Sequence, residues 1–180
     1  MPRPKAPPPP ASRCRGRGMN LREDIAVWDG KSAGAIGGIY TRYRTDPAFV
    51  RNILDYSKEG SLEVGATWLL KRHVEEGGEV DAAAAYRLAP GLGHWEAKLH
   101  LLQCMPHLPV PSAGRMAVER FLRACMADEA KFVRAWAYSG FHALAAQYPA
   151  YRDEARKLLE AALESEPPSV KARIRQTLKA

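Results

Sequence analysis

The sequence predicts an all-α fold, a right-handed superhelix of antiparallel helical hairpins. One pattern of apolar and small residues returns four times, led by Val64, Trp95, Val133 and Val170 at intervals of 31, 38 and 37 residues. Self-similarity at this period is typical of solenoids, in which each unit buries its apolar face only against its neighbours. From residue 20 onward the apolar residues recur at helical spacing, and no stretch alternates as a half-buried strand does.

Caps and turns delimit the helices of the first half of the chain. Asp46-Pro47 supplies an N-cap followed by proline at the first helical position, and Ser61 supplies the next N-cap. Gly77-Gly78 ends that helix, because glycine at a helix C-terminus adopts the left-handed conformation without strain. We therefore expect helices over residues 21–28, 32–44, 46–60 and 61–77.

The second half continues in the same way. Three prolines from 106 to 111 stop one helix, and Ser112 and Asp128 begin the next two, of which the second is the longest in the chain. The short loops require antiparallel neighbours. The expected helices cover residues 81–88, 94–105, 112–126, 128–148, 151–165 and 168–180.

Asp128 is followed by Val133-Arg134-Ala135, and this spacing resembles the second helix of a HEAT or armadillo-type repeat. The other units keep an alanine two positions after the leading residue but replace the arginine with Gly65, Glu96 and Lys171, which argues against a regular arginine ladder. The resemblance covers about residues 47–180. It implies that the second helix of each pair lines a concave face where partners dock.

Aligning the four units predicts one buried and one free face on each second helix. The positions led by Val64 and Ala66 are apolar or small in every unit, so we expect them in the core. The positions one, five and nine residues after the leader form a stripe, because residues four apart share a helical face. The predicted binding residues on this stripe are Glu96, His100, Arg134, Tyr138, His142, Lys171 and Arg175.

The centre of this stripe is predicted to be Glu96, His100, Arg134 and Tyr138. Tyrosine and arginine dominate binding hot spots, so the stripe is interpreted as a mixed-charge groove for a protein or peptide. A central histidine would make affinity vary between about pH 6 and 8. The alternative interpretation is a solvated helix face with no partner.

The net charge of +7 is concentrated at the N-terminus. Residues 1–18 carry +5 and no acid, so the rest of the chain carries only +2 and does not have a basic nucleic-acid-binding composition. Pro7 to Pro10 favours polyproline II, and we expect this tail to lack fixed structure, with one domain over residues 19–180. The tail is interpreted as an anchor for RNA or phospholipid, as a docking peptide, or as an extension before a true start at Met19.

No catalytic, metal or cofactor motif is found in the sequence. His73, His100 and His142 fall one to a repeat, about 10 Å apart, which is too far for one metal ion. The carboxylate pairs Glu75-Glu76 and Asp153-Glu154 occupy expected helix ends. We therefore expect neither enzyme activity, nor a metal, nor a cofactor.

Three cysteines without metal or disulfide spacing, and no apolar stretch of about 18 residues, favour a cytoplasmic protein. The first functional hypothesis is a small scaffold that binds a protein or peptide. The alternative is nucleic-acid binding, since DNA-alkylation glycosylases of HEAT type use tryptophans and cations, and Trp68, Trp95 and Trp136 stand among basic residues here. The nearly neutral body argues against this alternative. A third option, an enzyme of unrecognised mechanism, has no group of residues to support it.

Overall fold

The computed structural model describes residues 20–179, and this part of the chain is all helix and turn, without a strand. The all-α prediction is therefore confirmed, while the predictions for residues 1–18 and for the boundary at Met19 lie outside the described residues. The ten α-helices are α1 (Leu21–Ala26), α2 (Ala33–Tyr43), α3 (Phe49–Tyr56), α4 (Glu63–Glu75), α5 (Ala82–Tyr86), α6 (Trp95–Cys104), α7 (Arg115–Met126), α8 (Lys131–Gln147), α9 (Arg152–Ser165) and α10 (Pro168–Thr177).

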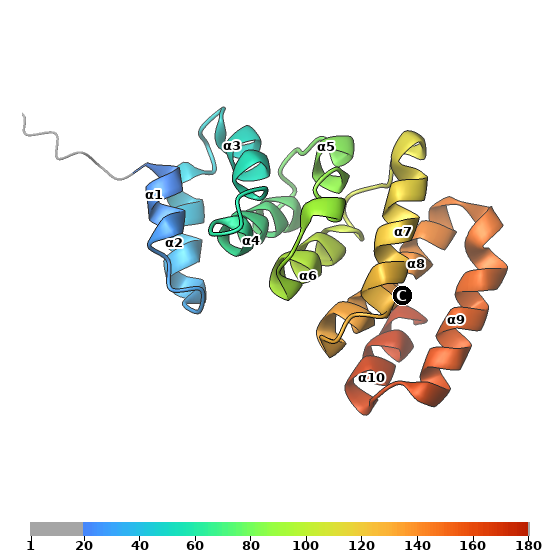
Figure 1. Ribbon diagram of the computed structural model, residues 1–180. Helices are drawn as coiled ribbons and strands as arrows, with labels where there is room; N and C mark the ends of the chain where they lie inside the picture. The colour runs from blue at the N-terminus through green and yellow to red at the C-terminus, as the bar shows by residue number, and fades with distance from the viewer. Residues whose placement is uncertain (1–19, 180) are drawn as a thin grey trace, which may run out of the picture.

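The helices follow one another as pairs from the N-terminus to the C-terminus (Figure 1). We call α4, α6, α8 and α10 the second helices. Each packs on the next, α4 on α6, α6 on α8, and α8 on α10, while α3 packs on α4, α7 and α9 pack on α8, and α9 also packs on α10. The second helices therefore form one continuous row.

Most predicted helix ends are confirmed within two residues, because local caps set them. Gly30 and Gly77 have positive φ where turns were expected, and Asp81 caps α5 through the N–H of Ala83. Ser61 does not cap α4: Leu62 is the N-cap residue and no side chain bonds there. Asp46 accepts from the N–H of Ala48, so α3 begins after this turn.

Counting from the N-cap residues of the second helices, Leu62, His94, Ala130 and Pro167, corrects the register of the repeat. The third and seventh residues after each N-cap are buried in every unit. They are Gly65, Ala97, Val133 and Val170, then Leu69, Leu101, Ala137 and Ile174. The pattern led by Val64 and Trp95 therefore starts one residue early on α4 and two early on α6.

Two predicted core residues are exposed, and the shift accounts for the one on α6. Trp95 is 39% exposed, because it is the first residue of α6 and has no preceding turn to pack beside it. Ala172 on α10 is also exposed. The expectation that the alanine position is buried in all four units is correct for Ala66, Ala97 and Ala135 only.

The corrected register also reveals a regular basic position, the fourth residue after the N-cap, which is Lys98, Arg134 and Lys171 on α6, α8 and α10. The Nζ of Lys98 lies 2.8 Å from Asp128 Oδ2, and Arg134 Nη2 lies 3.1 Å from Glu166 Oε2. Lys171 donates to the carbonyl of Glu164. Only one of these three residues is an arginine, so this is a ladder of basic residues and not the regular arginine ladder that the sequence argued against.

Helix α4 has Ala66 at the fourth position, and a carboxylate makes the corresponding connection. Glu63 Oε1 accepts from the N–H groups of Gly93 and His94 at 2.8 and 3.2 Å. The second helices α4, α6 and α8 are thus each tied to the loop that precedes the next one. These ties fix the spacing of the row on which any surface of the second helices depends.

Candidate functional site

His100 was predicted at the centre of an exposed stripe, and the structure buries it. His100 is only 9% exposed, and its Nδ1 lies 3.0 Å from Oγ1 of Thr67 on α4. The Thr67 hydroxyl donates its own proton to the Glu63 carbonyl at 2.8 Å. The proton between Thr67 Oγ1 and His100 Nδ1 is therefore carried by His100 Nδ1. His100 therefore connects α4 to α6 inside the row.

Burial lowers the pKa of His100 to about 3, and the positive charges of Lys71 and His94 act in the same direction. Desolvation is the larger cause, because the charged imidazolium loses water without gaining an acidic partner. The ring stays neutral from pH 6 to 8. His100 therefore gives no basis for the predicted pH dependence of binding in that range.

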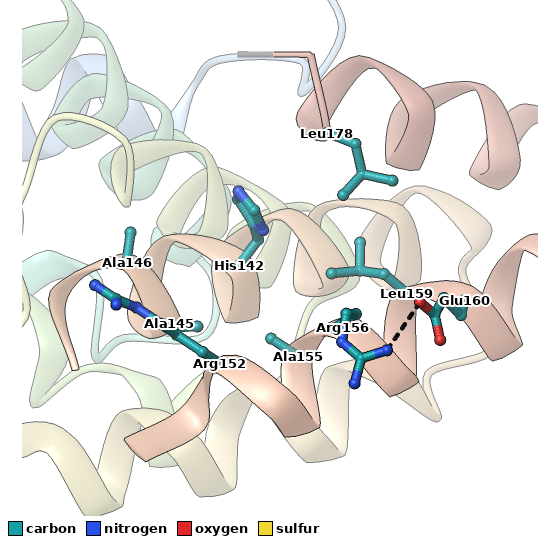
Figure 2. Close-up of a pocket in the computed structure, with 9 residues that line it drawn as sticks. All are labelled: His142, Ala145, Ala146, Arg152, Ala155, Arg156, Leu159, Glu160 and Leu178. Atoms are coloured by element: carbon teal, nitrogen blue, oxygen red, sulfur yellow. Dashed lines mark hydrogen bonds and ion pairs between the residues drawn. The ribbon is translucent and has the colours of Figure 1, made fainter. Parts of the chain in front are cut away.

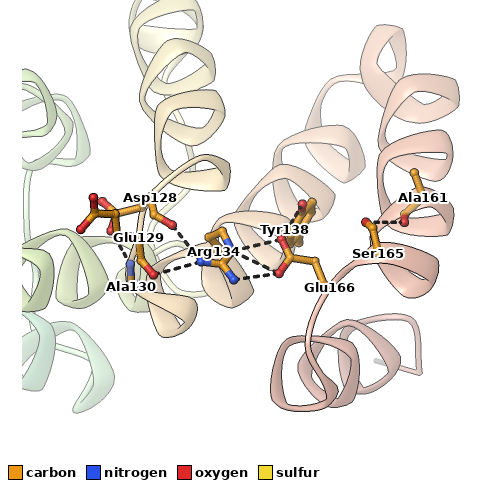
Figure 3. A network of polar contacts seen from close by, with 8 residues as sticks. All are labelled: Asp128, Glu129, Ala130, Arg134, Tyr138, Ala161, Ser165 and Glu166. Carbon is orange, nitrogen blue, oxygen red and sulfur yellow. Dashed lines mark hydrogen bonds and ion pairs between the residues drawn. The ribbon is translucent and has the colours of Figure 1, made fainter.

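Arg134 and Tyr138 were predicted to contact a partner, and both take part in a network within the chain (Figure 3). Arg134 pairs with Glu166, and its Nη1 donates to the carbonyls of Asp128 and Glu129 at 2.9 and 3.0 Å. The Tyr138 hydroxyl donates to Glu166 Oε1 at 3.2 Å, and burial beside this carboxylate raises its pKa.

This network joins the loop before α8 to the loop before α10. The Arg134 and Glu166 side chains are only 19% and 11% exposed, so both are held away from solvent. Replacing Arg134 and Tyr138 together would therefore remove an internal connection between these two loops. Contact of either residue with another molecule stays a prediction.

The other four predicted residues lie in separate places. Glu96 is half-buried at the start of α6 beside His94, and Lys171 bonds to the end of α9. His142 and Arg175 each line a different groove, described below. The seven predicted residues are not assembled into one exposed centre, because the register error mixed positions that face different neighbours.

His142 lines a groove between α8 and α9, which we call the α8–α9 groove. It has a volume of about 390 Å³ and a mostly apolar lining. Figure 2 shows Leu178, directly after α10, above Leu159 of α9, with His142 of α8 beside them. Arg156 at its rim pairs with Glu160 at 3.4 Å within the same helix.

Sequence reasoning missed a second feature, the sixth residue after each N-cap. These residues are Trp68, His100, Trp136 and Arg173, and we call them the sixth-position row. His100 is sealed inside, whereas Trp68, Trp136 and Arg173 are half-buried. Only counting from the helix starts, rather than from the apolar pattern, places two tryptophans at the same position of the repeat.

The two C-terminal members of the row stack on each other. The guanidinium carbon of Arg173 lies 3.5 Å from the ring centroid of Trp136, a cation–π contact. Arg173 Nε donates to Ser139 Oγ at 3.1 Å, and Ser139 Oγ lies 2.6 Å from Thr177 Oγ1. Burial lowers the pKa of the Arg173 guanidinium, the direction expected for a partly desolvated cation that has no carboxylate beside it.

This stack opens into a groove of about 550 Å³, which we call the α8–α10 groove. Phe132 at its edge is 51% exposed, and Lys131 Nζ lies 5.6 Å from the Phe132 ring centroid. Aromatic rings beside cations suit binding, and the lining has no carboxylate, histidine or cysteine that could act as acid, base or nucleophile. The lining residues are Phe132, Ala135, Trp136, Ser169, Ala172, Arg173, Arg175, Gln176 and Lys179.

Within residues 20–179 the structure gathers no group of three or more histidine, cysteine or acidic side chains that could hold a metal ion. In the same part of the chain, no helix has the length and apolar character needed to cross a membrane. Comparison with protein-family models, with curated proteins and with solved structures found no match. The resemblance to HEAT repeats therefore stays a prediction that depends on this chain's own residues.

Proposed function

We propose that the protein is a small HEAT-like helical-repeat scaffold whose helix pairs form a right-handed superhelix. Its row of second helices would present a surface that binds a protein or peptide partner. The packing of α4, α6, α8 and α10 in order, and the ladder of Lys98, Arg134 and Lys171, support this proposal. The buried free thiols of Cys104 and Cys125 favour a cytoplasmic setting.

The observation that carries the proposal is the α8–α10 groove, where Phe132 and Trp136 are accessible beside Arg173. Tryptophan, arginine and other large rigid side chains provide most of the energy at protein interfaces. An exposed aromatic ring at the rim of a groove offers apolar area that becomes buried when a partner docks. The binding surface is thus proposed at the C-terminal end of the row, away from the predicted centre at Glu96 and His100.

Site-specific photocross-linking tests this proposal. A photoreactive phenylalanine at Phe132 should give a cross-linked protein product from cell extract, whereas the same group at exposed Arg87, directly after α5, should not. The captured partner is then purified, and it should bind the native chain. Its affinity for the Phe132→Ser variant should be at least tenfold lower, a difference of about 1.4 kcal/mol. Equal cross-linking from both positions, or equal affinity for both proteins, would contradict the proposed surface.

Nucleic-acid binding remains the second candidate, and the stack of Arg173 on Trp136 favours it, since bases stack on aromatic rings beside cations. A single-stranded oligonucleotide titrated over a salt series tests this candidate in the full chain. The tail is first neutralised by replacing Arg3, Lys5, Arg13, Arg15 and Arg17 with glutamine. Affinity that persists and falls steeply with salt would support nucleic acid over peptide.

A further inference from the structure

The basic residues of the α8–α10 groove have no acidic partner. Arg175 and Lys179 make no side-chain hydrogen bond or ion pair with any residue in the described part of the chain. Arg173 bonds only to neutral groups, Ser139 and Gln176, and no carboxylate lines the groove. Three cations therefore face one groove without compensation.

On α4, and at the ladder positions of α6 and α8, positive charge is neutralised by carboxylates. Lys71 pairs with Glu75 at 3.1 Å, and Arg72 pairs with Glu76 at 2.6 Å on α4. The ladder residues of α6 and α8 pair with carboxylates in neighbouring loops. Uncompensated charge and an exposed aromatic ring thus coincide in the α8–α10 groove.

The groove also has an apolar component that pure charge attraction would not require. The lining includes carbon surface from Phe132, Ala135 and Ala172. A partner that covers this surface gains roughly 25 cal/mol for each Å² of apolar area removed from water. The complementary chemistry is an acidic chain that also carries a large apolar side chain.

We propose that the α8–α10 groove binds an acidic peptide segment with an aromatic or aliphatic anchor residue. The anchor packs against Phe132 and Trp136, and the acidic side chains pair with Arg173, Arg175 and Lys179. This inference rests on the proposed scaffold function and adds the chemistry of its partner.

A nucleic-acid strand fits these observations less well than a peptide. A strand needs cations spaced along its phosphates, whereas the uncompensated cations here are confined to one end of the row. At the other end, Trp68 is followed by Glu75 and Glu76, which already occupy Lys71 and Arg72. A short peptide needs only a local cluster.

Selection from a displayed library of random short peptides on the full chain tests this inference. Enriched peptides should be acidic and should share an aromatic or aliphatic residue. Their affinity should fall at least tenfold in Arg175→Glu/Lys179→Glu. The matched control is Arg51→Glu/Lys157→Glu, which makes the same charge change at exposed residues of α3 and α9 without described partners. All three proteins keep the same basic tail, so binding to the tail cannot produce the difference.

The outcomes separate this inference from the proposed function. Enriched peptides that are neutral or basic but are released by Phe132→Ser would overturn the acidic partner and leave the scaffold proposal standing. Acidic peptides weakened equally by both charge-reversal variants would also overturn it, because their attraction would be to net charge. If no peptide is enriched while a dT oligonucleotide binds through Arg175 and Lys179, both the inference and the scaffold proposal fail.

Discussion

The contact between α4 and α6 and the contact between α8 and α10 use the same helix positions, but the first is closed to solvent and the second is open. At the first contact, the sixth-position residue His100 is buried and bonded to Thr67. At the second, the sixth-position residue Arg173 lies over Trp136 beside an open groove. Helix α6 has α8 on its far side, whereas no helix follows α10 in residues 20–179.

This difference shows that position within a repeat does not fix accessibility by itself. An interior second helix is covered on two sides, so a polar residue at its sixth position must be satisfied internally. Within residues 20–179 no further second helix packs on α10, and its sixth position holds a cation that has no acidic partner.

Leu101→Ala and Ile174→Ala compare the seventh position at the two contacts. Both side chains are almost fully buried, at 1% and 0% exposure. We expect Leu101→Ala to lower the free energy of unfolding by about 2–5 kcal/mol, because α4 and α8 hold the cavity open. Ile174→Ala should cost less, since α10 can relax at the end of the row. Urea denaturation measures both, and an equal or larger loss for Ile174→Ala would remove the contrast.

Glu166→Ala tests the network that joins the last two helix pairs. It leaves Arg134 and Tyr138 without their shared carboxylate, so we expect a loss of about 1–3 kcal/mol. The control is Glu154→Ala, which removes an exposed partner of Arg123 and should cost less than about 1 kcal/mol. Thermal unfolding compares the two variants, and equal losses would mean that the network adds no more than a surface pair.

His100→Gln tests the closed contact through pH. The folded pKa of about 3 lies below the usual value of 6.5, so the unfolded chain binds more protons between these values. The stability that neutral His100 contributes is therefore present above pH 6.5 and is lost as pH falls toward 3. We expect the melting temperature of His100→Gln to fall less between pH 7 and 4 than that of the native protein. Superimposable curves for His100→Gln and the native protein would contradict burial of His100.

Phe132→Ser and Trp95→Ser compare exposed aromatic residues near the starts of α8 and α6. Both should change the free energy of unfolding by less than about 0.5 kcal/mol, since each ring is more than a third exposed. Only Phe132→Ser should reduce binding of the acidic peptides, because Trp95 does not line the α8–α10 groove. Fluorescence anisotropy with a labelled selected peptide measures this, and equal losses would place the site over the whole row.

The helices themselves could be predicted from the sequence because their signals are local. Asp81 and Asp128, with glycines at 30 and 77, mark turns and helix ends through hydrogen bonds and backbone conformations that involve only a few residues. The exception at Ser61 is informative. A serine can cap a helix, but the chain continues the turn through Leu62 before α4 begins.

The all-α composition and most helix ends could thus be predicted from the sequence, and the predicted period is close to the 32, 36 and 37 residues between the N-caps of the second helices. Only the tertiary structure decided which helix faces are covered. An offset of one or two residues rotates a side chain by about 100 to 200° around a helix, which is why His100 is buried and Trp95 is exposed. Arg134 pairs with Glu166 and Arg173 stacks on Trp136, in each case more than 30 positions away. The groove at Arg173 is open because α10 is the last second helix in residues 20–179. Such distant contacts leave no local signal in the chain.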